Sequence, residues 1–231
     1  MNYRNLILNK KNLSYEVSQY IKEQIVNGEI EIGSQLKINE ISDHLGISQT
    51  PVREAIQYLV SENVLENYRN KGYFVRKHNE KDIFEIYSLR ATIEGLAIRL
   101  AAQRNDEEEL NALIELFEEM KEKREDPAIT SISHYSTKIH EAILKMSKHE
   151  MLINVNESIS FQVEIVNSVL ERKYTKDFEV SEHEELIEVL KEGDPEKAEK
   201  VMRNHIYRSY YNFIEENEGV YSKELLMFFP K

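Results

Sequence analysis

Apolar positions in the first part of the chain recur with the period of an α-helix and stop at glycines. Residues 15–27 place valine and isoleucine side chains on one helical face, and Gly28 follows them. A second amphipathic stretch covers 38–45, before Gly46, and a third covers 48–61. We therefore predict that residues 38–61 form a helix, a tight turn and a second helix.

Two β-prone runs, VLENY and YFVRK, follow this pair of helices. They flank the turn residues Arg69, Asn70, Lys71 and Gly72, which is typical of a β-hairpin. A hairpin placed directly after a helix-turn-helix predicts the wing of a winged-helix domain.

From Glu80 onward the pattern is helical throughout. The predicted helices cover residues 81–104, 107–124, 129–147, 149–171, 177–192 and 195–217. We expect a mostly α fold with two domains, a winged helix over 1–78 and an all-helical bundle over 79–231. The final segment, 218–231, carries Leu225, Leu226, Phe228 and Phe229, and we expect it to dock on the helical domain or on a partner.

The charge is divided unevenly between these two parts. The net charge is −12, yet residues 1–78 carry 10 Lys+Arg and 9 Asp+Glu, whereas residues 79–231 carry 20 and 33. Nucleic acid contacts are therefore expected only in the first part. The absence of cysteine, of a signal peptide and of a long apolar run favours a cytoplasmic protein that neither crosses a membrane nor binds one.

The second helix of a helix-turn-helix presents its first side chains to DNA bases. Here those side chains are Ser48, Gln49, Thr50 and Arg53. Arg53 suits guanine and Gln49 suits adenine, while Ser48 and Thr50 suit phosphate. Arg69 and Lys71 on the wing are candidates for the DNA backbone, and Gly72 allows a close approach. The alternative for Arg53 is an ion pair with a carboxylate on a solvated face.

The stretch LKINEISDHLGISQTPVREAIQYLVSENVLENYRNKGYFV resembles the winged helix of GntR-family transcription regulators, and IYSLRATIEGLAIRLAA resembles the start of the FCD-type ligand domain of the FadR subfamily. The resemblance implies a ligand-responsive regulator, most often a repressor, that binds a pseudo-palindromic operator on double-stranded DNA as a homodimer. It favours Arg53 and Thr50 as operator contacts. Gln49 and Asn39 stand where relatives often have basic residues, so the operator sequence is not transferable.

Three histidines lie on the apolar faces of three different predicted helices: His140, His183 and His205. One inward histidine is usually a hydrogen-bonded core residue, but three together favour a divalent metal such as Zn²⁺. The resemblance implies the same, because many FadR-type domains bind a metal through an acidic residue and three histidines. Ser136 occupies the position of the acidic ligand, which leaves three alternatives: a three-histidine site, a weak site or an empty effector pocket.

Arg90 and Glu94 are spaced for a salt bridge on one helical face. Because relatives often sense small carboxylates, the resemblance also implies that Arg90 binds an effector carboxylate. Two other classes stay open: a metal-dependent enzyme that uses the three histidines, and a plain interaction module. The sequence contains no HExxH motif, phosphate loop or nucleophile elbow, so we expect no catalytic residues.

Overall fold

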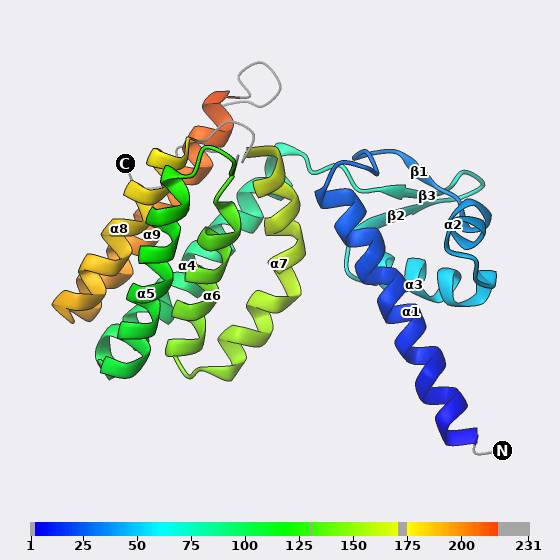
Figure 1. Cartoon of the computed structure of the whole chain (residues 1–231). Helices are drawn as coiled ribbons and strands as arrows, with labels where there is room; N and C mark the ends of the chain where they lie inside the picture. The colour runs from blue at the N-terminus through cyan, green and yellow to red at the C-terminus, as the bar shows by residue number, and fades with distance from the viewer. Residues whose placement is uncertain (1–2, 130, 171–174, 217–231) are drawn as a thin grey trace. The chain divides into compact units, whose positions relative to one another are not determined.

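The computed structural model describes residues 3–129, 131–170 and 175–216, and these fall into two compact units, 1–78 and 79–231. The protein is mostly helical, with one small antiparallel sheet in the first unit, as predicted (Figure 1). The residues from 218 to 231, with their four large apolar side chains, lie outside the described part of the chain. No helix in the described part is both long enough and apolar enough to cross a membrane.

The first unit is a winged helix. Its helices are α1 (Tyr3–Val26), α2 (Ile38–Leu45) and α3 (Gln49–Ser61), and its strands are β1 (Gln35–Leu36), β2 (Leu65–Tyr68) and β3 (Gly72–Val75). The helix-turn-helix and the hairpin are where the sequence predicted them. Two details differ, since α1 begins at Tyr3 rather than near residue 15, and β1 forms a third strand.

Strand β1 lies in a segment that the sequence suggested was only a turn. It pairs antiparallel with β3, so that the strand order is β1-β3-β2. A strand of two residues is too short to show an alternating pattern, and only backbone pairing with a distant segment defines it. The side chain of Gln35 also donates a 2.5 Å hydrogen bond to the carbonyl of Lys71, which ties β1 to the turn of the wing.

The turn between α2 and α3 depends on Gly46. This glycine has φ 65°, a left-handed conformation, and its N–H donates to the last turn of α2. Helix α3 then turns one face inward, with Val52, Ala55, Ile56 and Leu59 all fully buried. Because these four positions form a single stripe, the opposite face of α3 remains exposed for contacts outside the domain.

The second unit is a helical bundle in which α4 holds the central place. The helices are α4 (Glu80–Arg104), α5 (Glu107–Glu125), α6 (Ser133–Met146), α7 (Glu150–Leu170), α8 (Lys176–Glu192) and α9 (Pro195–Glu216). Helix α4 packs against α9, α6, α7 and α8, while α5 packs against α6 and α8 (Figure 1). Four of these helices, α4, α6, α8 and α9, converge with their polar core residues on one region of the bundle.

Helix ends and one small residue set the geometry of α4. Asn79 starts α4 with a capping box, in which its side chain accepts from the N–H of Asp82 and the Asp82 carboxylate accepts in return. Gly95 is buried where α4 meets α9, and a Cβ atom there would lie 2.9 Å from Cγ of Arg203. A glycine at this position therefore allows α4 and α9 to approach closely, which brings Arg90 and Glu94 near the residues of α9.

Candidate DNA interface and effector site

The first turns of α3 present the polar side chains predicted to contact DNA. Ser48 is the N-cap residue, but its side chain makes no capping hydrogen bond, so its hydroxyl group is available to an external partner. Gln49, Thr50 and Arg53 are all exposed. Arg53 forms no ion pair with any residue that the structure describes.

The wing carries two further cations at its turn. Arg69 and Lys71 are exposed and have no ion-pair partner among the described residues. Asn70 and Gly72 both have positive φ, 64° and 93°, so the turn is a tight one that leaves the backbone accessible. In Figure 1 the turn between β2 and β3 and the start of α3 lie toward the same end of the domain.

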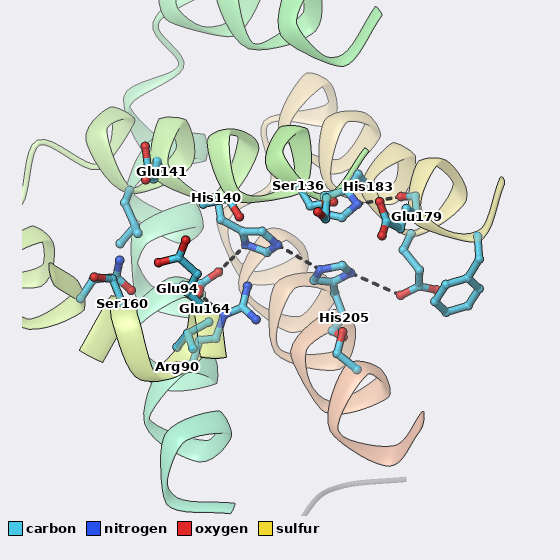
Figure 2. A pocket seen from close by; sticks show the side chains of 18 residues that line it. Arg90, Glu94, Ser136, His140, Glu141, Ser160, Glu164, Glu179, His183 and His205 are labelled. Atoms are coloured by element: carbon cyan, nitrogen blue, oxygen red, sulfur yellow. Dashed lines mark hydrogen bonds and ion pairs between the residues drawn. The ribbon is translucent and has the colours of Figure 1, made fainter. Parts of the chain in front are cut away.

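In the helical unit, His140, His183 and His205 come together inside the bundle. Their exposed fractions are 7%, 4% and 4%, and the distances between their ring centroids are 4.9–5.3 Å. One ring nitrogen of each lies within 4.8 Å of the others. Figure 2 shows the three rings facing one another, although they come from α6, α8 and α9.

Hydrogen bonds at Nδ1 orient two of the three rings, those of His140 and His183. His183 donates from Nδ1 to the carbonyl of Glu179 at 2.7 Å, and its buried Nε2 has no hydrogen-bond partner. His140 is bonded through Nδ1 to Glu94, and its Nε2 lies 3.2 Å from Nε2 of His205. Two unprotonated nitrogens at this distance repel each other unless a proton or a cation lies between them.

Carboxylates behind the rings complete this arrangement. Glu94 is buried between His140 and Arg90, whose Nε donates to Oε1 of Glu94 at 2.5 Å. Although burial raises the pKa of Glu94, the nearby charges of Arg90 and His140 outweigh it and lower that pKa to about 2. The predicted pair of Arg90 and Glu94 is therefore present, and it also orients a histidine.

Glu182 lies beside His205 at ion-pair distance, although Nδ1 of His205 makes no hydrogen bond. Its Oε2 atom lies 3.3 Å from Nδ1 of His205 and 2.9 Å from Nε of Arg208. Burial lowers the pKa of His205 to about 4, against the opposing effect of Glu182. Burial is the largest cause that lowers the pKa of His183, well below its usual value. Both rings are therefore neutral at neutral pH, which is the form that binds a metal.

A cavity of about 250 Å³ opens beside the histidines. Most of the residues that line it, from α4, α6, α7, α8 and α9, are of polar type, and its apolar residues are Leu144, Val163 and Phe178. Ser136 lines it, and its Oγ atom is buried without a hydrogen-bond partner. Arg90 also lines it, and because its contact with Glu94 uses Nε, the terminal nitrogens of the guanidinium group remain for another acceptor.

Several of these residues were not identified from the sequence. The sequence predicts Glu94 only as a partner for Arg90, and it gives no signal for Glu182. Nor was there any sign of the polar residues that α7 contributes to the cavity, such as Asn156 and Glu164. The acidic residues next to the histidines occur in a chain with 42 Asp+Glu, so their spacing alone did not distinguish them from a solvated face.

Two family models match this chain. Residues 13–75 match "Bacterial regulatory proteins, gntR family", and residues 85–208 match "FCD domain". Each match falls within one of the two structural units. The chain therefore belongs to the GntR-family transcription regulators that carry an FCD domain.

Curated relatives are regulators of the same kind. The chain is 29% identical over 199 residues to a probable D-xylose utilization operon transcriptional repressor of Paenarthrobacter nicotinovorans, covering 86% of this chain and 88% of the relative. It is also 29% identical to the gluconate operon transcriptional repressor of Bacillus subtilis, over 81% of this chain and 79% of the relative. These similarities support a DNA-binding regulator, and they do not favour the metal-dependent enzyme.

Solved structures agree in fold. The similarity to E. coli McbR/YncC has a TM-score of 0.74 at 22% identity and covers 89% of this chain and 99% of the other. A putative GntR regulator from Rhodococcus sp. RHA1 has a TM-score of 0.70 at 19% identity, over 87% of this chain and 97% of the other. At these identities the comparison establishes the fold alone. The properties of the site must be inferred from the residues of this chain.

Proposed function

We propose that this protein is an effector-responsive repressor that binds a pseudo-palindromic operator as a homodimer. The observation that carries the proposal is the start of α3, where Arg53 is exposed and unpaired among the described residues and is accompanied by Gln49 and Thr50. Such side chains at the start of a recognition helix read base edges in the major groove, and the wing cations Arg69 and Lys71 neutralise phosphates.

A dimer is supported by apolar side chains on α4. Leu89 and Leu96 lie on the same face of that helix, two turns apart, and their exposed fractions are 42% and 36%. Exposed leucines at this spacing suit the same face of a second copy, because an interface with two-fold symmetry uses one patch twice. Light scattering checks this: the double variant Leu89→Lys with Leu96→Lys should be a monomer, and a dimer of unchanged affinity would contradict it.

A divalent metal, most suitably Zn²⁺, would be held by Nε2 of His140, His183 and His205. The fit is supported by the unpartnered Nε2 of His183 and by the carboxylates and carbonyl behind the three rings. When bound, the ion supplies positive charge and open coordination positions for an oxygen of the effector. A small carboxylate effector would then lie between the histidines and the terminal nitrogens of Arg90.

Effector binding would act on DNA through thermodynamic coupling. If the bound effector favours one placement of the two winged helices in the dimer, their spacing matches or mismatches the two half-sites of the operator. The coupling predicts that operator affinity changes with the effector and, reciprocally, that effector affinity changes with the operator.

The central test is the selection of fragments of the source genome by the purified protein, followed by affinity measurements on the retained fragments. We expect one enriched sequence with two related half-sites, and retention of no fragment even at low salt would contradict the proposal. The metal is tested separately by elemental analysis. The wild type and His44→Ala, which changes an exposed histidine, should carry zinc, whereas His183→Ala should not.

A further inference from the structure

We propose that the start of α1, residues 3–13, is a third DNA contact of the winged-helix domain, in which the positive charge of Arg4, Lys10 and Lys11 neutralises phosphates of the DNA backbone. The inference rests on the proposed operator binding, and it adds a surface to the start of α3 and the wing. The helical pattern of the sequence begins only near residue 15, and the region that matches the GntR family model, residues 13–75, does not include these three cations.

Residues 3–13 decide the sign of the charge of the winged-helix domain. They contain three Lys+Arg and no Asp or Glu, whereas residues 14–78 contain 7 Lys+Arg and 9 Asp+Glu. Three of those seven cations form ion pairs with glutamates of the same domain: Lys22, Lys37 and Arg76. Without the start of α1, the domain would approach a polyanion with a net negative charge. The cations of residues 3–13 therefore contribute a large part of the attraction to DNA.

Two contacts define the direction of α1 relative to the recognition helix α3. The hydroxyl group of Ser14 donates a 2.5 Å hydrogen bond to Oε2 of Glu54, and Nζ of Lys22 lies 2.7 Å from Oε2 of Glu62. In both pairs the partner lies 40 positions further along the chain, so α1 and α3 run in the same direction where they pack together. Both helices therefore begin toward the same side of the domain, which is the side where α3 presents its DNA-reading residues.

Helix α1 extends beyond the position that corresponds to the start of α3. On the same offset, position 9 of α1 corresponds to Gln49, the first residue of α3, and residues 3–8 precede that position by about 9 Å of helix. Figure 1 shows the start of α1, the start of α3 and the turn of the wing toward the same side of the domain, with the start of α3 between the other two. This order suits α3 in a major groove and the two flanking elements on the backbone beside it.

The alternative is that the cations of residues 3–13 form ion pairs within their own domain. Glu54, which lies beside Ser14 one helical turn along α1 from Lys10 and Lys11, is the kind of partner that this alternative requires. An ion pair within the domain releases no counterion when DNA binds, whereas each phosphate that a cation neutralises releases one. The salt dependence of DNA binding therefore distinguishes the two arrangements.

Fluorescence anisotropy on the full chain at several salt concentrations is the first test. The triple variant Arg4→Gln with Lys10→Gln and Lys11→Gln removes the charge and keeps good helix formers in α1. We expect it to bind both operator and random DNA at least about tenfold more weakly at about 0.15 M salt, with base preference unchanged. The slope of log K against log salt should fall by at least about 2, since each lost phosphate contact removes about 0.9.

A second triple variant is the matched control. It makes the same change of net charge at three exposed lysines of the helical domain: Lys81→Gln, Lys191→Gln and Lys197→Gln. Its affinity and salt slope should equal those of the wild type, because a phosphate contact acts locally and distant charges are screened beyond about 10 Å.

Directed cleavage of the DNA locates the contact without removing any of the three cations. The chain contains no cysteine, so Asn5→Cys provides a single attachment site for an iron–EDTA reagent. On the selected operator we expect cleavage of the backbone beside the base pairs at which Arg53→Ala relaxes the preference. Ser61→Cys, at the opposite end of α3, is the control and should give no cleavage.

Three results would overturn the inference. These are a salt slope of the first triple variant equal to that of the control, no cleavage from position 5 on DNA that the labelled protein binds, and a loss of affinity that light scattering traces to dissociation of the dimer. The selection of operator fragments by the wild type is independent of all three. A protein that retains these fragments and gives any of the three results therefore refutes the inference alone.

Discussion

The charged side chains that matter for function are exposed in one domain and buried in the other. In the winged helix, Arg53, Arg69 and Lys71 are exposed and have no ion-pair partner among the described residues. In the helical domain, Arg90 and Glu94 are buried together. An exposed cation costs little to maintain and remains ready for a polyanion, whereas a buried charge must be neutralised within the fold. The comparison teaches that the first domain presents its charge to a partner, while the second uses charge to orient groups around a cavity.

The largest expected effect comes from breaking the buried pair. Glu94→Gln leaves Arg90 inside the bundle without a counter-charge and should lower the free energy of unfolding by about 3–5 kcal/mol, measured by urea denaturation of metal-free protein. Glu85→Gln is the control on the same helix, since the pair of Glu85 and Lys81 is exposed. Equal stability of the two variants would show that the buried charges are not a structural requirement.

Substitution of Glu182 distinguishes two roles of this residue, the orientation of the predicted metal ligand His205 and the ion pair with Arg208. Both Glu182 and Glu185 bind Arg208, but only Glu182 also faces His205. Glu182→Gln should lower zinc affinity by about 10–100-fold, measured by competition with a chromophoric chelator. Glu185→Gln should leave zinc affinity unchanged, and a similar loss in both variants would assign the effect to Arg208.

Arg53 tests whether an unpaired cation on the winged helix reads bases. Arg53→Ala should weaken operator binding by about 1–3 kcal/mol and relax the preference at one base pair of each half-site, measured by fluorescence anisotropy on a set of substituted operators. Ser61→Ala, at the other end of α3, is the control for general effects on the helix. If Arg53→Ala kept both affinity and preference, the direct-readout assignment would be wrong.

Lys71 should show a smaller and less selective effect. Lys71→Ala should weaken binding to specific and random DNA alike and reduce the slope of log K against log salt by about 1, as expected for the loss of one phosphate contact. Lys81→Ala, in the helical domain, should leave the slope unchanged. A change in base preference for Lys71→Ala would show that the wing reads bases and does not only contact phosphates.

The fold could be predicted from the sequence because helices and a hairpin have local patterns. Each of these patterns lies within one short segment of the chain. Examples are the apolar stripe of α3, the glycine at position 46 that ends α2, and the turn at residues 69–72. The sequence does not predict strand β1, because two residues are too few to show an alternating pattern of apolar and polar positions. The sequence predicts the start of α1 near residue 15 rather than at Tyr3, because the apolar stripe is clear only in the second half of this helix.

What the sequence alone determined is which side of each segment turns inward. Helical periodicity places His140, His183 and His205 on apolar faces and the side chains at the start of α3 on a polar one. The tertiary structure alone decided which buried groups meet. His140 bonds to Glu94 across 46 positions of the chain and faces His205 across 65. Periodicity reports the direction of a side chain from its own helix, but the packing of α4 against α6 and α9 sets the distance between atoms on different helices.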